Sequence, residues 1–142
     1  MYPTILEIHS ILRYVIFVLI AVLIIKHLAG WLNRSPFLKF DNILSTVTVS
    51  TIHLQLIIGL VLYFISPLVS FKGQVMQNEV MRYYTVEHIF MMLIAVVLFT
   101  VGRVKLKKKE DPVIKHREGF VYNMTGVLII VLTLALGSRG IL

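Results

Sequence analysis

Four apolar runs, each long enough to cross a lipid bilayer, constrain this chain more than any other feature. They cover about residues 5–28, 43–65, 80–104 and 118–136. A helix rises about 1.5 Å per residue, so about 20 residues cross the roughly 30 Å hydrocarbon layer. With 58% hydrophobic and only 15% charged residues, the chain has too little polar surface for a soluble domain. The sequence therefore predicts one all-α integral membrane domain over residues 1–142, in contact with the lipid bilayer.

The basic residues between the runs predict how the runs are arranged. Ten lie in or beside the connections that follow the first and third runs: Lys26, Arg34, Lys39, Arg103, Lys105, Lys107, Lys108, Lys109, Lys115 and Arg117. Three lie on the other side: Lys72, Arg82 and Arg139. Because Lys and Arg gather on the cytoplasmic side, we expect a multi-pass protein of the bacterial cytoplasmic (inner) membrane with both termini outside. The basic residues thus indicate topology, and no nucleic acid partner is expected.

Short connections between the runs make neighbouring helices antiparallel. The sequence therefore predicts an up-down-up-down four-helix bundle, with the first and third helices parallel and at opposite corners. The chain contains no Cys, which excludes thiolate metal sites and a covalently attached c-type haem. No Ser-His-Asp grouping or nucleotide-binding fingerprint is visible. Hydrolysis and nucleotide chemistry therefore have no support, although another catalysed reaction stays open.

Three histidines lie inside three different apolar runs, where ionisable groups are costly and usually functional. His9 and His88 lie a few residues inside the outer ends of two parallel helices, so both should sit about 8–12 Å below the surface at about 1.5 Å per residue. Two imidazoles at one depth on diagonal helices can approach a haem iron from opposite faces. His53 lies near the middle of its run. It is an alternative ligand, paired with His88, or a proton-handling position, and structural polar packing is the competing interpretation.

Helical periodicity places further candidates for cofactor contact beside these histidines. Tyr84 and Met92 share the face of His88, and Asn123 and Gly126 lie on a face of the last run whose small residues would admit a flat macrocycle. Arg13 lies one turn deeper than His9. It needs an anion, which is either a haem propionate or one of the carboxylates of Glu7 and Glu87.

Three other expectations concern residues around this constellation. Arg82 is a second candidate partner for a propionate. The second run carries Thr46, Ser50 and His53 on one stripe, and we expect this stripe to face the inside of the bundle because it is too polar for lipid. His27 and His116 lie next to basic residues at the cytoplasmic rim and are expected to act as interfacial anchors.

Three segments carry a family resemblance. They are Glu-Ile-His-Ser-Ile-Leu-Arg at 7–13, the His- and Gln-containing stretch at 51–59, and Tyr-Thr-Val-Glu-His at 84–88. The chain resembles the small four-helix membrane proteins of Bacteroidetes-type bacteria that are labelled cytochrome B. More distantly it is similar to one four-helix half of haem A synthase, whose ligand helix carries Glu-x-x-His-Arg. This chain has Glu7-x-His9 with Arg13 a turn later. The resemblance implies haem binding.

The sequence thus predicts one non-covalent b-type haem with His9 and His88 as axial ligands of the iron. A non-catalytic electron carrier or redox subunit is therefore favoured over an enzyme. Electrons would pass between the quinone pool, or a larger respiratory or other membrane complex, and an acceptor. The first alternative is a copper-binding or copper-transporting membrane protein that uses His88, Met92 and His9. The second is a structural subunit without a cofactor.

Overall fold

The computed structural model describes residues 2–67, 69 and 77–136. Four long helical segments make up almost all of this part of the chain: α1 (Tyr2–Asn33), α2 (Lys39–Ile65), a third segment (Glu79–Lys108) and α5 (Pro112–Leu136). The third consists of α3 (Glu79–Arg82), a π-helical turn η2 (Tyr83–Glu87) and α4 (His88–Lys108) in direct succession. All four are long and apolar enough to cross a membrane, which confirms the predicted helical membrane bundle. Lys72 and Arg139, used above for orientation, lie outside the described residues.

The helices extend beyond the apolar runs that predicted them. The first begins at Tyr2 and continues to Asn33, and the last begins at Pro112. Proline fits the first turn of a helix because its missing N–H has no partner there anyway. At the start of α2, Asp41 lies in the first turn and its Oδ2 accepts a hydrogen bond from the backbone N–H of Leu38 at 2.9 Å. Polar and basic residues outside the apolar runs therefore continue the helices at their ends.

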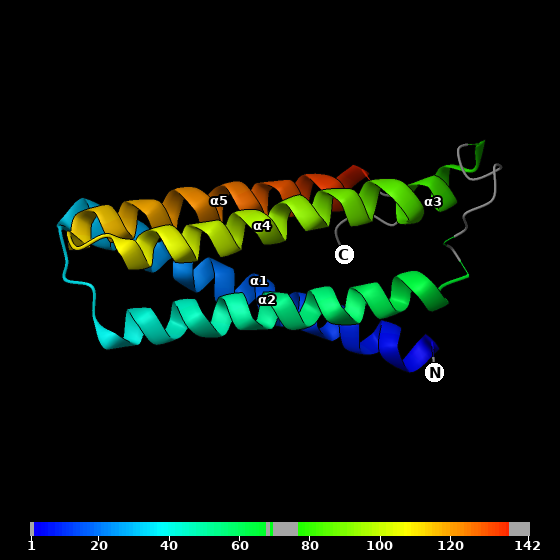
Figure 1. Cartoon of the computed structure of the whole chain (residues 1–142), viewed down its shortest axis with the longest axis horizontal. Helices are drawn as coiled ribbons and strands as arrows, with labels where there is room; N and C mark the ends of the chain where they lie inside the picture. The colour runs from blue at the N-terminus through cyan, green and yellow to red at the C-terminus, as the bar shows by residue number, and fades with distance from the viewer. Residues whose placement is uncertain (1, 68, 70–76, 137–142) are drawn as a thin grey trace.

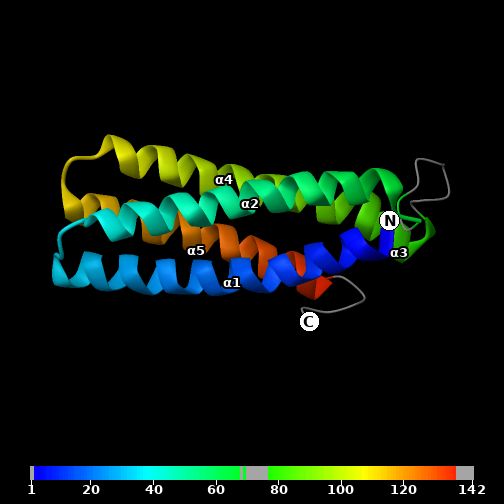
Figure 2. The same ribbon diagram turned by 90° about the horizontal axis from the view of Figure 1, so that it is seen from below.

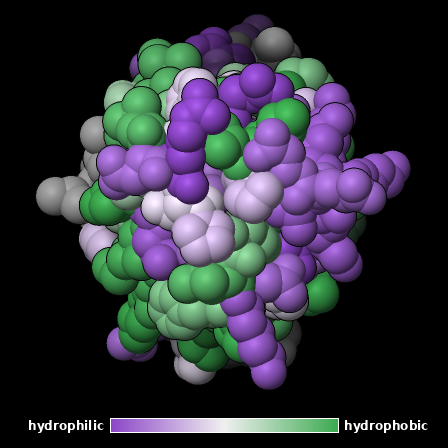
Figure 3. Space-filling model, turned by 90° about the vertical axis from the view of Figure 1, so that its left-hand side faces the viewer, coloured by the Kyte–Doolittle hydropathy of each residue, from purple (hydrophilic) through white to green (hydrophobic). Residues whose placement is uncertain are grey.

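The four segments form an antiparallel bundle (Figures 1 and 2). α1 packs against α2 and α5, and α4 packs against the same two helices. α1 and α4 therefore lie at opposite corners, as predicted. The α1–α2 and α4–α5 connections lie at one end, the loop end, and the start of α1 lies with α3 at the other, the N-terminal end (Figure 1). Figure 3 views the loop end, where hydrophilic side chains gather on part of the surface.

The core at mid-height contains Ile16, Ile20, Ile52, Ala95 and Phe99. The outside of the bundle exposes many large apolar side chains from all four helical segments. Exposed apolar surface on this scale is unfavourable in water and favourable in lipid. The packing is therefore that of a membrane protein whose interior and exterior are both apolar.

Candidate functional site: a cavity near the N-terminal end

A cavity of about 370 Å³ lies within the bundle and carries both depth-matched histidines on its wall. This volume is within the range of about 300–1,000 Å³ that is common for small-molecule and cofactor sites. His9 comes from α1 and His88 from the start of α4, so the two imidazoles reach the cavity from opposite corners of the bundle. The aliphatic and aromatic walls include Ile16, Ile52 and Phe99. The cavity is thus an apolar chamber with a few polar groups on its wall.

The π-helical turn η2 directly precedes His88 and brings Tyr83 close to it. The Tyr83 hydroxyl donates to the backbone oxygen of Thr133 on α5 at 2.8 Å. Its oxygen lies 3.5 Å from His88 Nδ1. Because the phenolic hydrogen is already used, the histidine must be the donor in this contact, through Nδ1–H. The neutral ring then keeps a lone pair on Nε2, which is the form that ligates a metal ion.

His9 is held by its backbone and not by its ring. The side chain of Gln55 on α2 donates through Nε2 to the backbone oxygen of His9 at 2.9 Å. His9 Nδ1 is buried without a hydrogen-bond partner, and so is Gln55 Oε1. A Cβ atom at Gly59 would stand 3.3 Å from His9 Cε1, so glycine gives the ring room here. The imidazole of His9 therefore lies at the cavity with unused bonding capacity.

Arg13 lines the same cavity and brings a positive charge into the apolar interior. Its guanidinium donates to Tyr14 Oη at 3.2 Å, and its Nε is buried without a partner. No ion pair joins Arg13 to a carboxylate among the described residues. Glu87 pairs with Arg82 instead, at 3.4 Å, and Glu7 is exposed. A half-buried cation whose Nε is fully buried is costly unless something in the cavity supplies a negative charge.

The other candidate residues fall into two groups. Tyr84 and Met92 line the cavity with His9 and His88. Arg82, Asn123 and Gly126 are not among the described residues that line it. Asn123 is buried and donates to the backbone oxygen of Gly119 at 2.7 Å, and a Cβ atom at Gly126 would stand 2.7 Å from Cζ of Phe99. Gly126 thus serves close packing against α4, and Asn123 bonds within α5.

The polar stripe of α2 does not face the inside of the bundle, which corrects the prediction: it lies beside the buried face, on the side toward α4. Thr46, Ser50 and His53 are exposed, and His53 does not line the cavity. His53 Nε2 lies 2.8 Å from Thr100 Oγ1 on α4. The helical spacing predicted correctly that Thr46, Ser50 and His53 share one face of α2. The inward face is instead formed by Ser45, Thr48, Val49 and Ile52, which are all buried. The expectation failed because a helix turned by about 100°, one residue step, keeps the same spacing.

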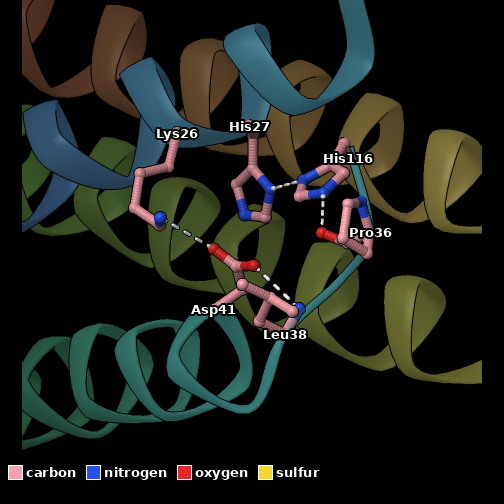
Figure 4. Close-up of polar contacts among 6 residues, drawn as sticks. All are labelled: Lys26, His27, Pro36, Leu38, Asp41 and His116. Carbon is pink, nitrogen blue, oxygen red and sulfur yellow. Dashed lines mark hydrogen bonds and ion pairs between the residues drawn. The ribbon is translucent and has the colours of Figure 1, made fainter. Parts of the chain in front are cut away.

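His27 and His116 are not rim anchors, which corrects the prediction. Both rings are buried, with 1% and 2% of the residue exposed, and their Nδ1 atoms lie 3.2 Å apart between α1 and α5 (Figure 4). His116 Nε2 lies 3.3 Å from the backbone oxygen of Pro36, which can only accept. In the neutral pair, His116 therefore accepts at Nδ1 from His27 Nδ1–H. His27 Nε2 is left buried without a partner.

The surroundings of this histidine pair explain its burial. Phe37 stacks on His27 with the ring planes 9° apart and the centroids 6.3 Å apart. Asp41, which pairs with Lys26 at 3.1 Å, points toward the two rings (Figure 4). The partner of His27 lies on the last helix, α5, which begins at the loop end where α1 finishes.

Comparison with known proteins finds no matching protein-family model, no matching curated protein and no matching solved structure. The fold and the cavity are therefore the basis for assigning a function. Among the described residues no group of three or more His, Cys, Asp or Glu side chains could hold a metal ion. Two imidazoles that share a metal with a macrocycle do not require such a group.

Proposed function

We propose that this chain binds one b-type haem in the cavity and carries electrons in the membrane, with His9 and His88 as the axial ligands. The observation that supports this most is that two histidines from opposite corners of the bundle line one cavity. The proposal also agrees with the resemblance of the sequence to small cytochrome B proteins.

The cavity residues fit a haem because several of their buried polar atoms have no hydrogen-bond partner. His9 Nδ1, Arg13 Nε and Gln55 Oε1 are all buried without partners, and all three residues line the cavity. Buried polar atoms are normally paired, so unpaired ones around a cavity point to a polar ligand. A haem offers an iron for the imidazoles and propionate carboxylates for a guanidinium. Its apolar ring would contact walls such as Phe99 and Met92.

The roles of the chain's own residues follow from their contacts. Tyr83 keeps His88 in the tautomer with a free Nε2 lone pair. Arg13 balances negative charge that would otherwise be buried alone, and the apolar walls keep water away. When bound, a haem with two imidazole ligands supplies one-electron redox chemistry at an iron without an open position. This chemistry suits electron transfer to or from the quinone pool or a partner complex.

The distribution of Lys and Arg favours a bacterial inner membrane with the N-terminal end outside. In that orientation the cavity lies in the outer half of the bilayer, because His9 and His88 both lie near the N-terminal end. Copper is the second candidate, since His9, His88 and Met92 all line the cavity.

Absorption spectra of the purified protein test the proposal. The wild type should show a Soret band that shifts on reduction with dithionite. His9→Ala and His88→Ala should each lose haem or change its spectrum, while His53→Ala, on the exposed side of α2, should match the wild type. A colourless protein that carries copper by elemental analysis would replace haem with the copper alternative. A colourless, metal-free protein whose stability does not depend on His88 would support the structural subunit.

A further inference from the structure

We propose that α2 pairs with α2 of a second copy of this chain, so that the protein forms a two-fold dimer in the membrane. The contact would run along the α2 seam, which is the line of exposed side chains Thr46, Ser50, His53, Ile57, Leu60 and Phe64.

Polar groups exposed deep in the membrane are the first observation. Thr46, Ser50 and His53 are all exposed, and His53 lies near the middle of α2. The exposed large side chains of α1 and α4 at comparable depth are apolar, for example Val18 and Val97. Lipid cannot hydrogen-bond to polar groups, so such groups in membrane helices face protein. Within the chain, α4 reaches only the edge of this face, where Arg103 Nη2 donates to Thr46 Oγ1 at 2.7 Å and Thr100 contacts His53, so another helix must cover the exposed remainder.

The hydrogen bonding of His53 specifies what the covering helix must offer. Thr100 Oγ1 donates to the backbone oxygen of Val96 at 2.8 Å. It therefore accepts in its 2.8 Å contact with His53, whose Nε2–H is the donor. The neutral ring then has an unprotonated Nδ1 on the exposed face of α2. This acceptor needs a donor, such as a hydroxyl group, from outside the chain.

The spacing of the α2 seam favours a helix that runs along its whole length. Successive members are four or three residues apart in strict alternation, which is the repeat by which two helices pack at a small left-handed crossing angle. The half toward the loop end is small and polar, and the half toward the N-terminal end is large and apolar. The covering helix must therefore present polar side chains opposite the polar half of the α2 seam and apolar side chains opposite its apolar half.

A second copy meets this requirement. In a membrane, two copies related by a two-fold axis along the membrane normal bring residues of equal depth together. The apolar half of one α2 then meets the apolar half of the other. The hydroxyl of Ser50, one turn from His53, is the donor that a second copy presents near His53 Nδ1. The six side chains of the α2 seam carry no charge, and the guanidinium of Arg103, which lies against Thr46 near the loop end, already donates to Asn42 Oδ1 and Thr46 Oγ1 at 2.7 Å.

Single-cysteine cross-linking in native membranes tests the dimer, because the chain has no Cys of its own. Ser50→Cys and Ile57→Cys each place one thiol on the α2 seam at an exposed position away from the cavity wall. Val18→Cys on α1 and Leu128→Cys on α5, both at exposed positions, are the matched controls. We expect mild oxidation to convert the two seam variants into covalent dimers of this chain, whereas the controls stay monomeric. Seam variants that cross-link no faster than the controls would overturn the proposal, and so would a covalent complex with a different protein.

Energy transfer between labelled copies in lipid vesicles gives a second readout. The double variant Ser50→Ala/His53→Leu should remain folded, because both side chains are exposed. Its dimer dissociation constant should rise about tenfold, which corresponds to about 1.4 kcal/mol. An unchanged dissociation constant, or a monomeric wild type, would contradict the role of the α2 seam. Neither readout depends on haem, so this test and the spectra of the proposed function can fail separately.

Discussion

His27 and His116 meet with their Nδ1 atoms 3.2 Å apart, and each ring packs against a glycine of the helix that carries the other. A Cβ atom at Gly119 on α5 would stand 2.5 Å from His27 Nε2, and one at Gly30 on α1 would stand 2.6 Å from the ring of His116. The two glycines let α1 and α5 approach closely with both imidazoles between them. This reciprocal packing fixes the loop end of the bundle, while the cavity lies near the other end.

Gly119→Ala should destabilise the protein by about 1–3 kcal/mol, because the new methyl group overlaps the buried His27 ring. Unfolding in detergent micelles measures the change. In a His27→Ala background the ring is absent, so the same substitution should cost much less. Thr125→Ala, at an exposed position of the same helix, is the control and should change stability by less than about 0.5 kcal/mol. An equal cost of Gly119→Ala in both backgrounds would show that the ring is not the obstacle.

Arg13→Gln should weaken haem binding about tenfold, which is about 1.4 kcal/mol. The reason is that a charge-assisted hydrogen bond to a buried carboxylate contributes about 1.5–3 kcal/mol. Titration of the haem-free protein with haem, followed by absorbance, measures the affinity. Arg82→Gln removes a guanidinium that is already paired with Glu87 and should leave the affinity unchanged. Equal effects of the two variants would argue against a specific role for Arg13.

Tyr83→Phe should lower stability by about 1 kcal/mol and also alter the haem spectrum. The hydroxyl donates to Thr133 O, and its oxygen is an acceptor for His88 Nδ1. Tyr63→Phe is a matched control on the wall of the same cavity, since its hydroxyl also donates to a backbone oxygen at 2.8 Å, that of Thr85. We expect it to lower stability and to leave the spectrum alone. A spectral change of equal size in both variants would contradict the positioning role of Tyr83.

The sequence predicted the parts of the structure that depend on depth and chain direction. The lengths of the apolar runs predicted the four membrane-spanning helices, and the short connections predicted that α1 and α4 lie at opposite corners. Together these two features place His9 and His88 on the wall of one cavity. The π-helical turn before His88 was not predicted, because a single wider turn leaves no trace in a 3.6-residue pattern. It brings Tyr83 next to His88.

The direction of the α2 stripe and the His27–His116 pair were missed for different reasons. Thr46, Ser50 and His53 were assigned to the interior on the argument that polar residues must face protein. The protein that they face can equally be a second chain, and in the structure these three residues are exposed. His27 and His116 stand beside charged residues in the sequence, which is typical of a membrane rim. The close approach of α1 and α5, allowed by Gly30 and Gly119, buries them instead.

Electron paramagnetic resonance of the oxidised protein tests the central claim most directly, because the signal reports the two axial ligands of a haem iron. We predict a low-spin ferric signal in the wild type, and its loss or conversion to high spin in both His9→Ala and His88→Ala, with His53→Ala unchanged. A wild type without a haem signal, or a low-spin signal that survives the loss of either His9 or His88, would contradict the account.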